Sequence, residues 1–536
     1  MSDRPIRRSS ALNSYVFRTV RSGFSAAQRL DPGLTALRAT AVGMAATLAA
    51  YGSALLLEHT AHLHVDILIQ AVALTLTLSR AGSGTGVADR LIALAVLPPL
   101  AVAAAETSRL MAGHRVAGDA VFTVLLAATI AVRRFGPRAT RAGTLAVLPL
   151  VAVLIVQVPG VPPAGHGQDL WAALVALIAA SWGLTARWAA ERTGFTRPHP
   201  PAYTPPARAG GGRRPSASTR MSLQMAGAVG AAFVAGHAAF AEHWTWAVLT
   251  AFVVCSGARG RADVLHKGVL RTAGAAAGTA AATLIAGTFG VHDHRTVVVI
   301  FIVLAAATWL RHFGYAYWAG CVTAVLALLY GYFGQSAPGL LGTRLEAIAV
   351  GAVLGVAAFW LILPIRSADV LRRRTADALA VLGDFLAAAR REPARLADDQ
   401  ARFDAAVRRL EQIAGPLRAH RALHGLHHPG RSHPADAIDA VRRCAAPVHA
   451  IARCAAEHHA VLDAPGVLRM HAAVAADLTR ARLAVGRRTL PGPPPPARDE
   501  TVPAAPESPA DRVRAALTDL DAALRTLQRI FVPARG

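Results

Sequence analysis

The chain has 536 residues, of which 54% are hydrophobic, and it carries a formal net charge of +24 at pH 7. Few soluble chains of this length are so apolar, so the composition indicates an all-α membrane protein that crosses the bilayer many times. A strongly basic chain could bind nucleic acid, but these arginines collect in loops beside apolar segments, as membrane topology requires. We therefore expect no nucleic acid as a partner.

Residues 1–33 are predicted to form a basic cytoplasmic segment. No apolar run follows its arginines, so the pattern does not indicate a cleavable signal peptide. Several apolar residues could form one face of a helix that lies on the membrane surface, and a disordered basic tail is an equal alternative. The residues of that face are Val16, Phe17, Val20, Phe24 and Leu30.

Twelve apolar segments follow, each of about the length that a transmembrane helix requires. The loops predicted on the cytoplasmic side are rich in arginine, whereas the predicted outside loops at 58–64 and 159–168 have neither lysine nor arginine. The loop at 109–115 departs from this rule, with two arginines. An even number of spans places both termini in the cytoplasm, and we expect the bacterial inner membrane. The segments are residues 36–57, 65–79, 91–108, 116–132, 142–158, 169–186, 221–241, 243–257, 270–289, 296–311, 315–333 and 345–364.

Two stretches about 180 residues apart share one pattern. Residues 122–148 read FTVLLAATIAVRRFGPRATRAGTLAVL, and residues 301–326 read FIVLAAATWLRHFGYAYWAGCVTAVL. Phe, Val, Leu, Ala-Ala-Thr, Arg, Phe-Gly, Ala-Gly and Ala-Val-Leu recur in the same order. The pattern predicts two parallel six-helix transmembrane repeats, at 34–186 and 221–365, joined by a cytoplasmic linker rich in Pro, Gly and Arg at 187–220.

Residues 366–536 are predicted to form a helical cytoplasmic domain, because charged residues alternate with Ala, Leu and Val at helical spacing. A Pro-rich stretch at 490–510 predicts a disordered break. The expected helices are residues 372–391, 395–421, 434–461, 465–487 and 509–531. A histidine-rich stretch lacks carboxylate or cysteine partners at a metal-binding spacing, so we expect a solvated turn and no metal site. Its histidines are His420, His424, His427, His428 and His433.

The second predicted repeat carries four motifs in order. The first is W-x-x-L-T, from Trp246 to Thr250, and the second is R-x-x-G-x-x-x-G, which begins at Arg271. A Y-x-Y-W run followed by Thr323 comes next, and R-x-E-x-x-x-x-G begins at Arg344 and is closed by Pro364.

This order and spacing resembles the fusaric acid resistance and aromatic acid exporter family, and more distantly the aluminium-activated malate channels of plants. The resemblance covers about 221–366, and more weakly 36–186, where Arg271 and Arg344 have no counterparts. It implies a transporter, either an exporter or a channel, for small organic and often aromatic carboxylate anions. It also implies efflux across the inner membrane without an enzymatic step.

Under this resemblance, arginines would pair with a carboxylate, and aromatic rings would stack on an aromatic substrate. The residues expected to bind substrate are Arg271, Arg311, Trp246, Thr250, Tyr317, Trp318 and Thr323. Small residues and helix-breaking prolines are expected to pack the helices around the pathway, namely Gly274, Gly278, Gly351, Pro98 and Pro99. Arg344 and Glu346 could form an ion pair.

Several alternatives remain open from the sequence. Arg271 and Arg311 could instead extend to the membrane surface, and the aromatic residues could form an interfacial belt. Glu106, Asp66 and Asp119 are candidates for proton coupling. The chain lacks a phosphate-binding loop, a nucleophile elbow and a zinc-protease motif, so we expect no enzymatic activity and no cofactor.

The expected partners are the lipid bilayer and a small organic anion; a second copy of the chain or a periplasmic adaptor could also bind. A different function would be that of a membrane scaffold or regulatory protein acting through its cytoplasmic helical domain.

Overall fold

The computed structural model describes residues 31, 33–61, 66–78, 87–156, 169–196, 216–286, 290–334, 339–427, 432–488 and 508–531. Within these ranges the chain forms α-helices and short 3-10 helices and no strand. Most of the basic segment 1–33, with its suggested interfacial face, lies outside the described residues. So do most of the linker at 187–220 and nearly all of the Pro-rich break at 490–510.

The chain divides into two compact units. The described part of the first, here called the membrane unit, lies within residues 1–200, 214–256 and 267–363. The described part of the second, here called the C-terminal unit, comprises 257–266 and 364–536. The first residues of α10 therefore belong to the C-terminal unit and the rest of that helix to the membrane unit.

The membrane unit holds a helix at each of the twelve predicted apolar segments. In the first half these are α2 (Thr35–Ala61), α3 (Asp66–Leu78), α4 (Val87–Gly113), α5 (Arg115–Ala131), α6 (Pro137–Val156) and α7 (Asp169–Arg192). In the second half they are α8 (Ala217–Phe240), α9 (Trp244–Cys255), α10 (Arg261–Ala286), α11 (His294–Leu310), α12 (Tyr315–Tyr332) and α13 (Gly339–Leu361). Two 3-10 turns, η1 (Val132–Phe135) and η2 (Ala241–His243), follow α5 and α8.

Eight of the described helices are long and apolar enough to cross a membrane, namely α2, α4, α5, α6, α7, α8, α12 and α13. Helices α3, α9 and α11 are apolar but shorter. The protein is thus a multi-pass membrane protein, and the count of twelve spans stays a prediction. Several helices extend beyond the predicted segments: α10 begins at Arg261 rather than 270, and α7 continues to Arg192, inside the predicted linker. Charged residues in these end turns hid the helix from a hydropathy pattern.

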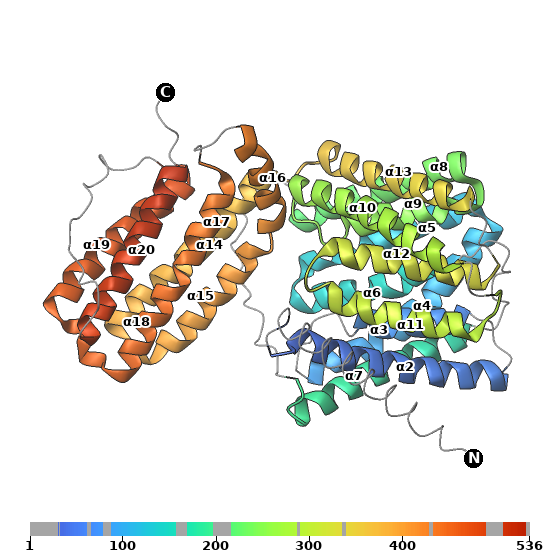
Figure 1. Cartoon of the computed structure of the whole chain (residues 1–536), viewed down its shortest axis with the longest axis horizontal. Helices are drawn as coiled ribbons and strands as arrows, with labels where there is room; N and C mark the ends of the chain where they lie inside the picture. The colour runs from blue at the N-terminus through green and yellow to red at the C-terminus, as the bar shows by residue number, and fades with distance from the viewer. Residues whose placement is uncertain are drawn as a thin grey trace, which may run out of the picture. The chain divides into compact units, whose positions relative to one another are not determined.

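Each half of the membrane unit contains three helices that all pack against one another (Figure 1). Helices α2, α3 and α7 pack against one another, and so do α8, α9 and α13. Across the halves, α5 packs on α8 and α11 packs on α2. The close approach rests on small buried residues such as Ala50, Ala54 and Ala228, which let helix backbones come near one another.

The C-terminal unit is a set of amphipathic helices around one apolar core. Its helices are α14 (Ser367–Arg391), α15 (Leu396–Glu411), α16 (Ala414–His427), α17 (Pro434–Arg443), α18 (Ala445–Glu457), α19 (Pro465–Val485) and α20 (Pro509–Phe531), with 3-10 turns η3 (Pro393–Arg395) and η4 (His459–Asp463). Phe385, Phe403, Leu410 and Leu520 are fully buried there. The burial of one face of each helix accounts for the helical spacing of the apolar residues in the sequence.

Two helices predicted as continuous are each broken in two. The predicted helix 395–421 is α15 and α16, and the predicted helix 434–461 is α17 and α18. Pro416 has no N–H to bond the carbonyl of Gln412, which instead accepts a hydrogen bond from Nη1 of Arg259 at 3.1 Å. Pro447 is the third residue of α18, as Pro416 is the third residue of α16.

Candidate functional site

Arg271 lies deep in the membrane unit and is only 1% exposed. It is ten residues past the start of α10, and it is the fifth residue of the part of α10 that belongs to the membrane unit. Its Nη1 donates to the carbonyl oxygen of Ala319 at 3.2 Å and to Oγ1 of Thr323 at 3.1 Å. The Thr323 hydroxyl donates to the same carbonyl at 2.9 Å. The side chain of Arg271 is therefore buried against α12, and its depth in the membrane stays a prediction.

Glycines bring α10 close enough to α12 for this contact. A Cβ on Gly278 would lie 2.1 Å from the carbonyl oxygen of Gly320, and one on Gly274 would lie 2.5 Å from that of Ala316. Only glycine fits at such distances, so the two helix backbones touch. The predicted packing residues Gly274 and Gly278 thus set the position of the Arg271 side chain against α12.

The hydrogen-bond partners of the Arg271 guanidinium are all neutral within the described ranges. They are one carbonyl and one hydroxyl, and Nε of Arg271 is buried without a partner there. Burying an unpaired charge costs on the order of several kcal/mol even after relaxation. The arrangement thus leaves a fixed positive charge, with unused donor capacity, inside an apolar bundle.

A second buried arginine, Arg344 of α13, lies against two aromatic rings. Its Cζ atom is 4.7 Å from the ring centroid of Tyr330 and 5.6 Å from that of Trp246. The two rings are themselves 5.6 Å apart and tilted by 40°. Cation–π attraction of about 2 kcal/mol or more is expected for such desolvated contacts. The side chain of Arg344 is thereby held between α9 and α12.

Buried polar atoms on α9 face the same region. Trp246 is 2% exposed and its indole Nε1 has no hydrogen-bond partner among the described residues. Thr250 lies one turn further along α9, is fully buried, and its Oγ1 also lacks a partner there. Trp246 and Thr250 share one face of the helix. These are groups that could hydrogen-bond a polar solute.

Helix α12 connects the two arginine clusters. Thr323 touches Arg271, and Tyr330 lies seven residues, or two turns, further along the same face. The two contacts are therefore separated by about 10 Å along α12. Together the clusters form a strip of cationic, hydroxyl and aromatic groups, here called the arginine strip, defined by Arg271, Thr323, Tyr330, Arg344 and Trp246.

Residues 227–358 match the family model described as fusaric acid resistance protein-like. We call this segment the fusaric acid resistance protein-like domain, after the model that it matches. It begins within α8, ends within α13 and contains the whole arginine strip. No curated protein matches the chain.

Other residues predicted to bind substrate lie elsewhere in the fusaric acid resistance protein-like domain. Arg311 and Trp318 line a surface hollow at the α11–α12 turn together with His312 and Tyr315. Tyr317 is 59% exposed. The structure therefore buries Arg271, Trp246, Thr250 and Thr323 and joins Arg271 to Thr323, but it leaves Arg311, Tyr317 and Trp318 at the periphery.

The remaining predicted residues have packing positions. A Cβ on Gly351 would lie 2.2 Å from the carbonyl oxygen of Ala247, so α13 touches α9 there. Arg344 is buried whereas Glu346 is exposed, and residues two apart on a helix do not face each other, which does not favour the predicted ion pair. Pro98 and Pro99 lie inside α4, within the first half and outside the fusaric acid resistance protein-like domain.

Two buried leucines of the first half have places in the sequence like those of Arg271 and Thr323. Leu97 follows Asp89 by eight residues, as Arg271 follows Asp263 in the matching Ser-Gly-containing stretch. Leu145 directly precedes Ala-Val-Leu, as Thr323 does in the second half. Leu97 and Leu145 are 0% and 4% exposed and belong to one apolar cluster. The polar contact thus occurs in one half and an apolar contact in the other.

Sequence reasoning missed Tyr330 and Gly320. Tyr330 ends the same apolar run that contains Thr323, and its spacing of seven residues was a usable signal. Gly320 is the second member of the Ala-Gly step that recurs in both halves. Its role depends on the partner helix, which a single-helix pattern does not identify.

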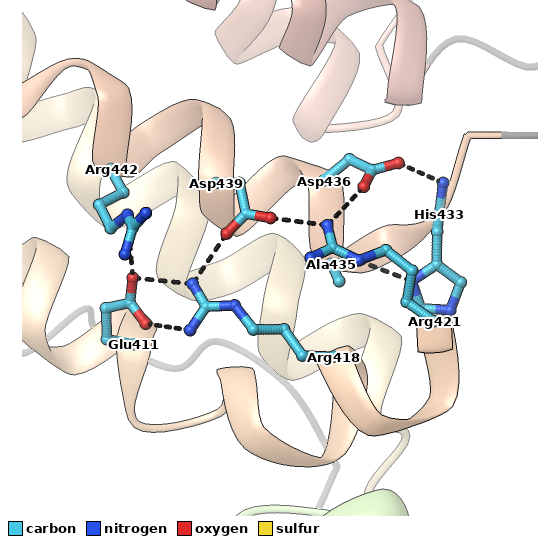
Figure 2. A network of polar contacts seen from close by, with 8 residues as sticks. All are labelled: Glu411, Arg418, Arg421, His433, Ala435, Asp436, Asp439 and Arg442. Carbon is cyan, nitrogen blue, oxygen red and sulfur yellow. Dashed lines mark hydrogen bonds and ion pairs between the residues drawn. The ribbon is translucent and has the colours of Figure 1, made fainter. Parts of the chain in front are cut away.

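The C-terminal unit has its own polar cluster (Figure 2). Arg418 donates to both oxygens of Glu411 at 3.0 and 3.1 Å and to Oδ1 of Asp439 at 2.8 Å. Arg421 donates to Asp436 at 2.7 Å and to Asp439 at 2.6 Å. Burial raises the pKa of Asp439, but hydrogen bonds from the two arginines outweigh this and hold that pKa below its ordinary value. The cluster ties α15, α16 and α17 together.

The predicted histidine-rich turn is partly described. His433 caps α17, with its Nδ1 accepting from the N–H of Ala435 at 3.1 Å (Figure 2). Nε2 of His433 lies 2.8 Å from Nδ1 of His420. In the described ranges no group of His, Cys, Asp and Glu could hold a metal ion. His428 and the side chains of His424 and His427 lie outside what the structure describes.

Proposed function

We propose that the protein is an inner-membrane transporter, acting as an exporter or a channel, for small organic carboxylate anions, and for aromatic ones in particular. The membrane family and the apolar helices make it a transporter in general. The observation that carries the substrate class is the burial of Arg271 with neutral partners only among the described residues.

A carboxylate supplies what this guanidinium lacks. Nε and one Nη of an arginine can donate two parallel hydrogen bonds to the two oxygens of a carboxylate. The negative charge would also offset the cost of the buried positive charge. An anion without such a group would gain the charge attraction but not the paired hydrogen bonds.

The aromatic part of the arginine strip supports an aromatic substrate. Trp246 and Tyr330 present large ring faces beside Arg344, and rings of this kind attract other rings by about 0.5–1.5 kcal/mol beyond burial. An acid that leaves Arg271 could pass to Arg344 of α13. The contact of Arg344 with Tyr330 lies about two turns along α12 from the contact of Arg271 with Thr323. Two successive cationic positions suit passage better than a single deep one.

The packing scheme supports two related repeats around this pathway. The triplet α2, α3 and α7 matches the triplet α8, α9 and α13 in order and in mutual contact, and the α5–α8 contact matches the α11–α2 contact. With twelve spans in two parallel repeats, both termini and the C-terminal unit would lie in the cytoplasm.

The test is reconstitution of the full chain in liposomes and measurement of the flux of a panel of acids, including benzoate and hydroxybenzoates. We expect Arg271→Gln to lower the flux at least tenfold and Arg271→Lys to lower it less, because lysine keeps the charge but not the paired donors. Thr323→Ser should stay near wild type, whereas Thr323→Val should weaken transport.

Arg138→Gln is the matched control, because Arg138 is an exposed arginine of the first half. Size-exclusion profiles establish that each variant is folded. The proposal fails if wild type moves no acid faster than empty liposomes, or if Arg271→Gln transports as well as wild type. Binding of a partner protein by the C-terminal unit, with an inert membrane unit, would instead support the scaffold function.

A further inference from the structure

An acid and a base meet where the two halves of the membrane unit touch. Asp119 lies in the second turn of α5 and His237 in the last turn of α8, and Nε2 of His237 is 2.8 Å from Oδ2 of Asp119. Their side chains are 13% and 16% exposed. Helices α5 and α8 come from different halves, so this pair, here called the inter-half pair, links them directly.

The inter-half pair lies beside a layer of aromatic rings. The imidazole of His237 is 4.7 Å from the ring centroid of Trp244 and 6.1 Å from that of Phe233. One turn further into the bundle, the rings of Phe122 and Phe233 meet edge to face. Oδ1 of Asp119 and Nδ1 of His237 are buried without a hydrogen-bond partner among the described residues. Both groups therefore have spare capacity to bind a proton or a water molecule.

Few other charges act on this pair. Arg115, one turn before Asp119, is the nearest charged group on α5. Across the α4–α5 turn, Glu106 and Arg109 form an ion pair with each other. The titratable groups on the elements packed against α8 include His243 of η2 and two residues of α13, Arg344 and Glu346. Arg344 lies on Tyr330 and Trp246, and Glu346 is exposed.

Asp119 lies near the N-terminal end of α5, whereas the arginines of η1 and of the first turns of α6 follow its C-terminal end. These arginines therefore do not neutralise the carboxylate of Asp119. These are Arg133, Arg134, Arg138 and Arg141.

The matching contact on the other side lacks such a pair. There Phe301 of α11 meets Tyr51 of α2, and the residue one turn before Phe301 is Val298, which is 59% exposed. The aromatic contact is thus common to both places and serves packing. The carboxylate and imidazole are added at one place only, so packing does not require them. Ionisable groups inside a membrane bundle are costly and mark ion or proton paths.

We propose that the inter-half pair is the proton-binding site that couples a proton gradient to the movement of the organic anion. One proton shared by the pair gives a carboxylate and an imidazolium, which attract each other and hold α5 to α8. Uptake of one further proton by Asp119 gives a neutral carboxyl beside an imidazolium and removes that attraction. Release of this proton restores the attraction, so each cycle takes up and returns one proton.

The location suits this role. In the predicted topology the start of α5 and the end of α8 face the outside, from which protons enter down their gradient. Relative movement of the two repeats about a fixed site is the usual basis of alternating access. The inference rests on the proposed function, because coupling requires a transported anion, but its site is separate from the arginine strip.

The experiment measures two fluxes in proteoliposomes with benzoate or hydroxybenzoate as the probe. One is downhill flux in a substrate gradient at equal pH, and the other is accumulation driven by an imposed pH gradient. We expect Asp119→Asn and His237→Gln to keep the downhill flux within about twofold of wild type. Both variants should lower the pH-driven accumulation at least tenfold. Asp119→Glu should recover part of it, and Glu106→Gln, an acid on the same side, should match wild type.

These outcomes separate the two proposals. Arg271→Gln should lose both fluxes, and an inert wild type would contradict the proposed function rather than the proton site. A readout that needs no substrate is the infrared difference spectrum between neutral and acid pH, because a protonated carboxyl group has a carbonyl band that a carboxylate lacks. Wild type should show a band that Asp119→Asn lacks and Glu106→Gln retains. The inference is overturned if Asp119→Asn retains full pH-driven accumulation, if it loses both fluxes equally while folded, or if it retains that carboxyl band.

Discussion

Phe122 and Phe301 make matching edge-to-face contacts with the opposite half of the membrane unit. Phe122 meets Phe233 at a centroid distance of 5.7 Å, and Phe301 meets Tyr51 at 5.0 Å. Each is the first residue of one copy of the recurring motif. A residue that is repeated in the sequence therefore does the same structural task twice, once on α8 and once on α2.

Replacing these rings should loosen the contact between the halves. We expect Phe122→Leu and Phe301→Leu each to lose the ring–ring attraction of about 0.5–1.5 kcal/mol. Phe122→Leu should cost more, because Phe122 is fully buried whereas Phe301 is partly exposed. Thermal unfolding in detergent measures this. Phe135→Leu, at a ring that is 69% exposed, should leave the midpoint unchanged; an equal loss there would show that the effect is not specific to the contact.

The approach of α10 to α12 should tolerate no added methyl group. A Cβ on Gly278 would lie 2.1 Å from a backbone carbonyl oxygen, which has no flexible end to move aside. We expect Gly278→Ala to reduce the yield of folded protein or its melting temperature strongly, in the range of about 1–3 kcal/mol for overpacking. Gly331→Ala, where the space is open, should be silent or slightly stabilising. Equal behaviour of the two would contradict the packing.

The polar cluster of the C-terminal unit should stabilise it in a pH-dependent way. Asp439→Asn leaves Arg418 and Arg421 without a shared carboxylate, and we expect a loss of about 1–3 kcal/mol in the local stability of α16 and α17 at pH 7. Hydrogen exchange of their amides measures it. Glu392→Gln, in an exposed pair with Arg395, is the control and should change nothing.

The sign of the pH effect follows from the lowered pKa of Asp439. A carboxyl group whose pKa is lower in the folded state stabilises the fold above its ordinary pKa of about 4, and the gain is lost as the pH falls through the lower value. The difference between wild type and Asp439→Asn should therefore be full at pH 7 and shrink below about pH 4. A difference that is constant over this range would contradict a role for the ionised carboxylate.

Both termini should lie on the cytoplasmic side. A fluorescent protein fused to either end should fluoresce, and alkaline phosphatase fused to either end should be inactive, because each reporter works on one side of the inner membrane only. A fusion within the outside loop at 159–168 should show the reverse. Opposite results for the two ends would mean an odd number of spans and would rule out two complete six-helix repeats.

The sequence was informative wherever a single helix determines the outcome. Apolar length located a helix at each of the twelve segments, and the family resemblance named Arg271 and Thr323, which the structure joins by a hydrogen bond. The match to the fusaric acid resistance protein-like model confirmed that resemblance for 227–358. The malate channel resemblance and the roles of the site residues stay predictions.

The sequence predictions failed or were incomplete where the position of a residue depends on more than its own apolar segment. The polar turns from Arg261 to Lys267 were taken for a loop, although they continue α10, so Arg271 was placed too near a helix end. The single-helix pattern gave no sign that Arg344 would lie on Trp246 and Tyr330, since that depends on how α9, α12 and α13 meet. Likewise, Asp119 was one acid among three until His237 was found opposite it.

Leu97 and Leu145 give the two halves unequal duties. Identical subunits around a twofold axis would each bring a guanidinium to the centre, and the two like charges would repel one another and bind two anions. In a single chain with two predicted parallel repeats, the second half can hold the cation while the first half supplies an apolar support. The stoichiometry that follows is one Arg271 position per chain, and a chain that gained an arginine at Leu97 should fold poorly rather than transport twice as much.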